Sequence, residues 1–297
     1  MVRSLRKRFI LFSVLVISSI LIILGLLVYI GPTSNLSARQ YITTILLTIG
    51  MVLVGSWLLS KAAIRPIQEA WQKQLDFTAD ASHELRTPVA VIQTNLELVM
   101  DSPKETVESQ MKWLKNIEAE NRRMAKLLED LLTLSRADTN QQVLEIETFM
   151  FDEILTEVLI PLEPVADRKN LALEVNIHNK IAFHGDRKRI KQLIIILVDN
   201  ALKYTDSSGT VAVSLTRSEK ALSLTVSDTG PGIEREHLKK IFDRFYRVTK
   251  TRNLNQDGSG LGLSIAKWIV QEHGGTIQVA SSPGAGTVFT VSLPNNQ

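Results

Sequence analysis

The chain has 297 residues, with 34 Lys and Arg side chains against 31 Asp and Glu and no cysteine. A hydrophobic content of 44% with 22% charged residues excludes a largely disordered chain, and the missing cysteines exclude disulfides and thiolate metal sites. The net charge of +3 gives no argument for nucleic-acid binding, and we expect no direct contact with nucleic acid.

Two long uncharged runs, at 9–30 and 41–60, stand near the beginning of the chain. A helix over the first run covers about 33 Å, which is enough for a hydrocarbon core of about 30 Å. The apolar core of a signal peptide is shorter, at about 7–15 residues, and here a second run follows at once. The sequence therefore predicts two transmembrane helices, joined outside the cell by a loop at 31–40.

Basic residues predict the orientation of these helices. Lys and Arg cluster before the first run and just after the second, whereas the loop contains only Arg39. The positive-inside rule then places both termini in the cytoplasm. A loop of about ten residues cannot bury a core of its own, so we expect a stimulus to enter through the spans, the loop, the lipid bilayer or a membrane accessory protein.

A helical hairpin is predicted after the second run. Apolar and small residues alternate in steps of three and four, which predicts a seam along one helix face: Leu75, Thr78, Ser82, Leu85, Val89, Ile92, Leu96 and Val99. Ser102, Pro103 and Glu105 form a capping box that predicts a second helix ending near residue 137. Two antiparallel helices bury little alone, so we expect a homodimer with a four-helix bundle.

His83 follows a seam residue directly, so its side chain should point partly to solvent. Pro88 lacks an N–H and should bend the helix just after His83, and an exposed imidazole beside a bend is a candidate functional site. A lone histidine is more often a surface residue without a role. We prefer that interpretation for the other four histidines: His178, His184, His237 and His273.

The remainder of the chain mixes strand and helix patterns, which predicts an α+β two-layer sandwich. Strands are expected at 171–177, 210–216, 222–226, 276–280 and 287–293, and helices at 187–204, capped by Asp186, and at 260–273. Glycines cluster at 230–232, 258–262 and 284–286. Glycine and a helix N-terminus both favour phosphate, so the three clusters indicate a nucleotide site rather than three simple turns. The 258–262 cluster follows a polar loop, which disfavours a dinucleotide-binding fingerprint.

These segments together resemble a bacterial sensor histidine kinase. The likeness covers about 70–294 and is carried by five boxes in the expected order: a phosphoacceptor box at 82–88, an asparagine box at 199–204, glycine boxes at 228–232 and 258–262, and a phenylalanine box at 242–247. It implies a multi-pass protein of the bacterial cell membrane. Its parts would be a membrane segment at 1–60, a helical linker, dimerisation and phosphotransfer domain at 61–140, and a catalytic ATP-binding domain at 141–297.

The resemblance implies that His83 takes the γ-phosphoryl group of ATP and passes it to an aspartate of a response regulator. Glu84 would orient and deprotonate the imidazole, and Thr87 would position water for dephosphorylation of the regulator. Too few residues separate the second run from His83 for a complete relay module. The sequence therefore predicts a continuous helical connection, and a kinase of the intramembrane-sensing type.

For the nucleotide, the resemblance implies that Asp228 accepts a hydrogen bond from the adenine amine, Asn200 holds Mg²⁺ and Lys203 neutralises phosphate charge. Residues 233–257 would form a lid over ATP. The other implied nucleotide-binding residues are Tyr204, Gly230, Gly232, Phe242, Phe245, Gly258, Gly260, Leu261 and Gly262.

One position departs from the family pattern. The family often has an asparagine four residues before Asn200, where this chain has Ile196, which cannot ligate Mg²⁺. We expect a single asparagine with water to suffice. Two alternatives to the kinase remain open: a response-regulator phosphatase with weak kinase activity, and a membrane receptor that binds ATP only as a structural ligand.

Overall fold

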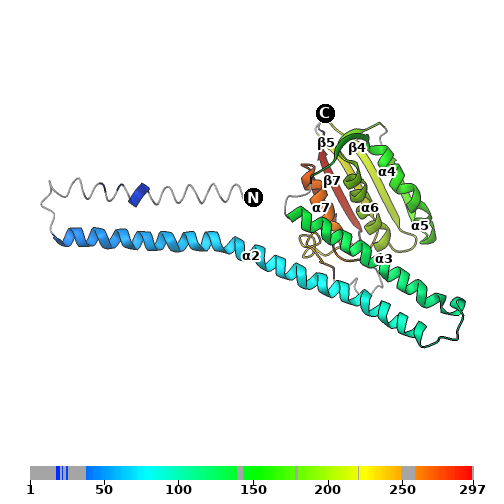
Figure 1. The fold of residues 1–297 in the computed structure, drawn as a ribbon. Coiled ribbons are helices and arrows are strands. Elements are labelled where there is room, and N and C mark those ends of the chain that lie inside the picture. Colours follow the sequence, from blue (N-terminus) through cyan, green and yellow to red (C-terminus); the bar gives the residue numbers. More distant parts are fainter. Residues whose placement is uncertain are drawn as a thin grey trace. The chain divides into compact units, whose positions relative to one another are not determined.

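The computed structural model describes residues 18–20, 22, 25, 38–138, 143–177, 180–219, 221–248 and 258–295 (Figure 1). The chain divides into two units, Met1–Thr78 and Ala79–Gln297. Most of the predicted first span at 9–30 and most of the predicted loop lie outside the described residues. Across the part of the chain that is described, no helix is long and apolar enough to cross a membrane.

Helix α2 (Ala38–Met100) includes the second uncharged run and continues without a break past His83. The predicted continuous helical connection is therefore confirmed. The helix also remains intact through Pro88, whose side chain is buried. The bend expected near that proline stays a prediction.

Helix α3 (Val107–Asp138) follows a short turn and completes the predicted hairpin with the second half of α2 (Figure 1). Its predicted N-cap, Ser102, is wrong: the Thr106 hydroxyl accepts from the Ser109 N–H at 3.3 Å instead. The reason lies in Gln110, whose buried amide donates to the carbonyls of Val99 (3.2 Å) and Ser102 (2.8 Å). Carbonyl groups at and just after the C-terminal end of α2 thus receive hydrogen bonds before α3 begins.

The C-terminal part contains two sheets. A two-stranded antiparallel sheet pairs β1 (Ile146–Met150) with β3 (Ala182–Asp186). A five-stranded sheet has the order β2 (Ala172–Ile177), β4 (Thr210–Arg217), β5 (Ala221–Asp228), β7 (Thr287–Pro294) and β6 (Thr276–Ser281). The pair β2–β4 is parallel and the other pairs are antiparallel. All five predicted strands are present.

Helices cover one face of the larger sheet (Figure 1), and these are α4 (Phe151–Leu159), the 3₁₀ helix η1 (Ile160–Leu162), α5 (Glu163–Arg168), α6 (Arg187–Tyr204) and α7 (Gly262–Glu272). Alternate residues of β4 and β5 are buried under α6, whose own inward residues are fully buried: Ile190, Leu193, Ile194, Leu197 and Val198. The predicted α+β two-layer sandwich is therefore confirmed. Residues of α6 and α7 pack in the same core, which places the start of α7 beside α6.

The prediction of a surface position is wrong for His273, which is only 8% exposed. Its Nε2 accepts from the Asp186 N–H at 3.0 Å, so its Nδ1 carries the proton and donates to the Ile269 carbonyl at 2.8 Å. Both ring nitrogens are thereby satisfied, which is what a buried imidazole requires. His273 is a structural residue that ties α7 to the start of α6.

Candidate nucleotide-binding site

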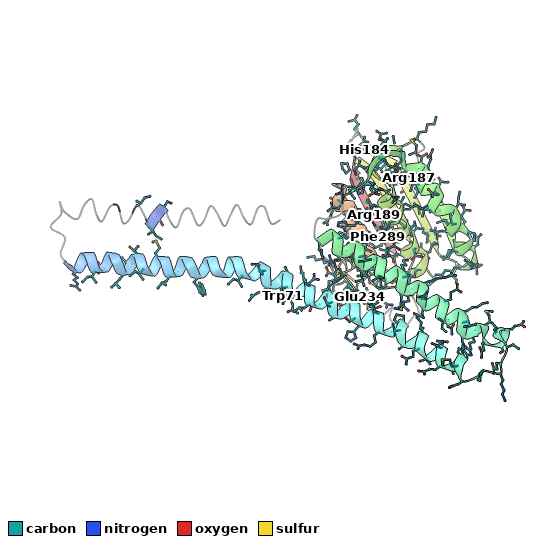
Figure 2. The ribbon with its side chains drawn as sticks, viewed as in Figure 1. Trp71, His184, Arg187, Arg189, Glu234 and Phe289 are labelled. Carbon is teal, nitrogen blue, oxygen red and sulfur yellow. The ribbon has the colours of Figure 1, made fainter. Side chains whose placement is uncertain are left out.

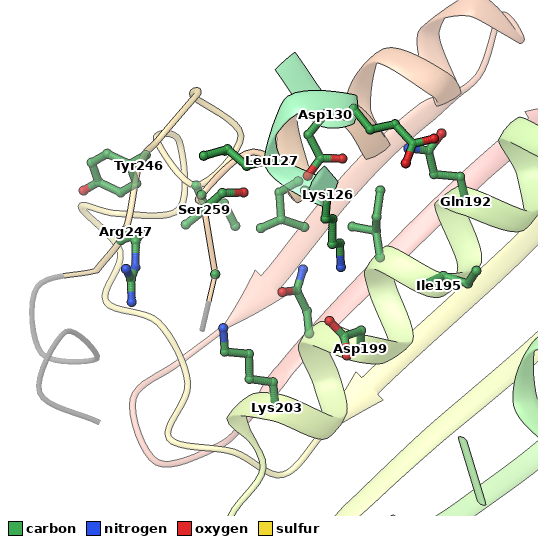
Figure 3. A pocket seen from close by; sticks show the side chains of 18 of the residues that line it. Lys126, Leu127, Asp130, Gln192, Ile195, Asp199, Lys203, Tyr246, Arg247 and Ser259 are labelled. Atoms are coloured by element: carbon green, nitrogen blue, oxygen red, sulfur yellow. The ribbon is translucent and has the colours of Figure 1, made fainter. Parts of the chain in front are cut away.

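A pocket of about 1270 Å³ opens in the second unit between α3, α6 and the segments around α7 (Figure 3). Many of the residues implied by the resemblance line it: Glu84, Asn200, Lys203, Tyr204, Asp228, Gly232, Gly258, Gly260 and Gly262. Others of that set are described but do not line it: His83, Thr87, Gly230, Phe242, Phe245 and Leu261. The structure thus brings residues from all five sequence boxes to one cavity.

Helix α6 positions the asparagine box. Asp186 caps this helix as predicted, because its carboxylate accepts from the Arg189 N–H at 3.0 Å in the first turn. Figure 2 labels Arg187 and Arg189, which both belong to that turn. The last turns then present Asn200 and Lys203 to the pocket. The Lys203 ammonium lies beside the glycine segment, 2.7 Å from the place that a Cβ on Gly258 would take.

Asp228 is the last residue of β5, where it pairs with Thr287 of β7. Burial raises the pKa of the Asp228 carboxyl, and hydrogen bonds from the backbone N–H groups of Gly230 and Thr287 act in the opposite direction. The Gly230 N–H donates to Asp228 Oδ1 at 2.9 Å. Gly230 therefore orients Asp228 rather than lining the pocket itself.

Glycine is required at two places next to the pocket. Gly232 has φ +71°, and a Cβ there would lie 2.0 Å from the Ser282 carbonyl oxygen. Gly260 has φ +73°, and a Cβ there would lie 2.7 Å from the backbone carbonyl carbon of Phe245. Both positions combine a left-handed backbone with a close backbone neighbour, so any side chain would displace the wall of the pocket.

The phenylalanine box packs the segment before α7 onto the domain. The ring of Phe242 meets that of Phe289 edge-to-face, with centroids 6.4 Å apart, and Phe245 has φ +59° where its backbone covers Gly260. Tyr246 and Arg247 follow and line the pocket, although neither was predicted as a site residue. The tip of the predicted lid lies outside the described residues.

One wall of the pocket comes from α3 and was not predicted. Lys126, Leu127 and Asp130 line it, and Leu127 is 5% exposed within the same hydrophobic core as α6 and α7. At the end of α3, both terminal nitrogens of Arg244 donate to the Asp138 carboxylate, at 2.7 and 2.6 Å. Hydrophobic burial and this ion pair together hold α3 against the α+β sandwich.

The residues of the phosphoacceptor box lie on different faces of α2. Glu84 is half-buried and lines the pocket, whereas His83 and Thr87 are exposed on α2. Consecutive helical residues point about 100° apart, which accounts for the difference. In this arrangement, the neighbour of His83 faces the nucleotide site and His83 itself does not.

Asn200 lines the pocket together with Lys203, and its amide oxygen is a type of ligand that Mg²⁺ accepts. Ile196, one turn earlier, also lines the pocket, and its Cγ2 would be 3.3 Å from a Cβ on Gly262. Where the family often has an asparagine, this chain thus has the packed apolar side chain of Ile196. Phosphate oxygens and water would complete the coordination of a metal held by Asn200.

Asp130 gives a pH-dependent prediction. Burial is the main cause that raises its carboxyl pKa from 3.8 to about 6, while Lys126 lowers it and Glu129 raises it. The folded chain therefore binds this proton more tightly than the unfolded chain. Its contribution to stability is full below about pH 4 and is lost as the pH rises through about 6.

We expect the change in the free energy of unfolding caused by Asp130→Asn to be more favourable at about pH 7.5 than at about pH 4.5. The expected difference is about 1–2 kcal/mol, after discounting for the partial exposure of Asp130. Urea unfolding at the two pH values measures the difference. Glu174→Gln, an exposed carboxyl on β2, is the matched control. An equal effect of Asp130→Asn at both pH values would contradict a raised pKa.

Comparison with known proteins identifies both parts of the second unit. Residues 73–140 match the His Kinase A (phospho-acceptor) domain, and residues 185–297 match the family described as histidine kinase-, DNA gyrase B-, and HSP90-like ATPase. Sensor protein CiaH of Streptococcus pneumoniae is 39% identical over 245 residues, which cover 81% of this chain and 54% of CiaH. Sensor protein SrrB of Staphylococcus aureus is 36% identical over 227 residues, which cover 75% of this chain and 38% of SrrB.

The chain thus spans about half the length, or less, of these curated relatives. Among solved structures, the Acinetobacter baumannii histidine kinase AdeS is 30% identical with a TM-score of 0.59, covering 72% of this chain and 98% of AdeS. Histidine kinase ThkA, solved in complex with response regulator protein TrrA, is 26% identical with a TM-score of 0.58, covering 80% of this chain and 65% of ThkA. With a phosphoacceptor hairpin, an ATPase sandwich and these relatives, the chain belongs to the histidine kinase family.

Proposed function

We propose that this chain is a sensor histidine kinase that autophosphorylates His83 from ATP and passes the phosphoryl group to an aspartate of a response regulator. One observation carries the proposal: Glu84, the direct neighbour of His83, lines the same pocket as Asn200, Lys203 and Asp228. A purely structural ATP site would have no need of a carboxylate from the phosphoacceptor helix.

Each residue has a defined task in this reaction. Asp228 accepts from the adenine amine, and Lys203 neutralises charge on the phosphates. Mg²⁺, held by Asn200, would reduce the negative charge on the phosphate oxygens. A nitrogen of His83 then attacks the γ-phosphorus, ADP leaves, and Glu84 accepts the imidazole proton.

His83 must approach the pocket for this step, because it is exposed on α2 and does not line the pocket. We propose that the ATPase sandwich moves relative to the hairpin between nucleotide binding and phosphoryl transfer. Rigid-body motion of one domain relative to another is a common way to complete a catalytic site.

Partners follow from the exposed surfaces of the hairpin. Val89, Leu96 and Met111 are each more than 40% exposed in a single chain, as expected if a second copy covers them in a four-helix bundle. The solved ThkA complex holds a response regulator. We propose the same class of partner, with a receiver-domain aspartate, for this homodimer.

We also propose that the runs at 9–30 and 41–60 anchor the protein in the bacterial cell membrane, with both termini in the cytoplasm. The support is the uncharged sequence and the first part of α2. Among the side chains described there, these apolar ones are more than half exposed: Ile42, Leu46, Leu47, Ile49, Met51, Leu53, Val54 and Trp57. The short loop between the runs favours sensing within the bilayer, directly or through a membrane accessory protein.

Incubation of the full chain with γ-labelled ATP, followed by addition of a response regulator, tests the function. The kinase predicts an acid-labile, base-stable label that moves to the regulator. Weak labelling with rapid loss of phosphate from a phosphorylated regulator would favour the phosphatase alternative. Nucleotide binding without any label would favour the receptor alternative.

Thr87 provides a prediction for the reverse activity. It is exposed four residues after His83, so both side chains lie on one face of α2. If Thr87 positions water, Thr87→Ala should slow dephosphorylation of the regulator about tenfold or more and leave autophosphorylation unchanged. Timed loss of regulator phosphate measures the effect. Thr94→Ala, farther along the same helix, is the control, and parallel loss of both activities would refute this role.

A further inference from the structure

Lys126 enters the pocket from the wall opposite α6. It lines the same cavity as Asn200 and Lys203, although it belongs to the phosphoacceptor hairpin. Figure 3 shows the Lys126 side chain extending from α3 toward the space above α6, while Lys203 points into that space from below. Arg247 lies on a third side of the pocket.

From this convergence, we propose that Lys126 of α3 binds the phosphate chain of the nucleotide, so that the phosphoacceptor domain itself supplies part of the ATP site. The inference rests on the proposed function, because it takes the pocket to be a nucleotide site. An ammonium group carries a full positive charge and three donors, which suit phosphate oxygens.

Charge favours an anion between these two lysine side chains. Two ammonium groups directed into one cavity repel each other, and the repulsion grows as the cavity excludes water. Asp199 and Asp130 supply negative charge at the edges of the pocket. A polyphosphate between Lys126 and Lys203 would instead turn mutual repulsion into two attractive contacts.

Within the described part of the chain, no hydrogen bond or ion pair engages the Lys126 ammonium directly. Its electrostatic neighbour is Asp130, one turn along α3. A lysine placed four residues before an acid is the weaker orientation of a helical pair. The side chain is therefore available to a ligand.

Lys126→Met tests the proposal, because methionine keeps an unbranched side chain and removes the charge. The dissociation constants of ATP, ADP and adenosine are measured on the full chain at fixed Mg²⁺. We expect binding of ATP to weaken about tenfold, binding of ADP to weaken less and binding of adenosine to stay unchanged, since only phosphate contacts are lost. Lys126→Arg should retain most of the ATP affinity.

Lys115→Met, on the same helix and outside the pocket lining, is the matched control and should bind all three ligands as the wild type does. Unchanged ATP affinity in Lys126→Met would overturn the proposal. So would tighter ATP binding, which would mean that Lys126 competes for the phosphate position, or an equal loss for adenosine, which would indicate general damage. Failure of the unaltered chain to bind any nucleotide would refute the proposed function itself, and this inference with it.

Discussion

Replacing His83 by glutamine should abolish phosphorylation of the chain by ATP. Glutamine has no ring nitrogen able to form a stable phosphoramidate, so the nucleophile is lost. Affinity for ATP should stay the same, because His83 is exposed on α2 and does not line the nucleotide pocket. Labelling with γ-labelled ATP and a direct binding measurement, made on the same preparation, check both parts.

His184→Gln is the matched control, since His184 is exposed on β3 and hydrogen-bonds to Thr148 at 3.1 Å. It should label like the wild-type chain. Acid-labile label that persists in His83→Gln would move the acceptor to another residue. Loss of ATP affinity in that variant would instead show that His83 supports the pocket in a way that its exposure does not suggest.

Asp228→Asn should weaken ATP binding about a hundredfold, because a site built around one buried hydrogen bond rejects a mismatched partner strongly. The Gly230 N–H holds one oxygen of Asp228 at 2.9 Å. In the variant the amide oxygen should keep that bond, so that the NH₂ group faces the adenine amine, donor against donor.

The same orientation predicts a change of specificity. Inosine triphosphate has an acceptor in place of the adenine amine, so Asp228→Asn should bind it better relative to ATP than the wild-type chain does. Competition between the two nucleotides measures this ratio. Asp206→Asn, on an exposed loop outside the pocket lining, should leave the ratio unchanged. A constant ratio in Asp228→Asn would refute the adenine contact.

Local signals account for the parts of the fold that were predicted well. Asp186 followed by a helical pattern placed α6 at its observed bounds, and alternation placed β4 and β5 within two residues at each end. The start of α3 was misplaced because Gln110 bonds back to the turn, which no capping pattern encodes. Strands β1 and β3 were not predicted, because both are short and their pairing joins residues far apart in sequence.

The candidate site also has residues that local motifs predicted and residues that they did not. Asn200, Asp228 and Gly260 were found because each stands in a short motif with a chemical reason. Lys126 was missed because its place opposite α6 depends on how a helix of the hairpin packs against the ATPase fold. In α3 it reads as one more exposed lysine, and no spacing or composition distinguishes it from Lys115.

The close approach of Gly260 to the backbone of Phe245 restricts how this sequence can change over evolutionary time. Any residue other than glycine at 260 would need both a strained φ and a shifted neighbour, since its Cβ would meet main-chain atoms that no rotamer change can move. A substitution at 245 cannot relieve that clash, because the obstructing atoms are common to all amino acids. Descendants of this protein should therefore keep glycine at 260 even where the side chain at 245 drifts, and a survey of natural variants would show one position frozen beside one that varies.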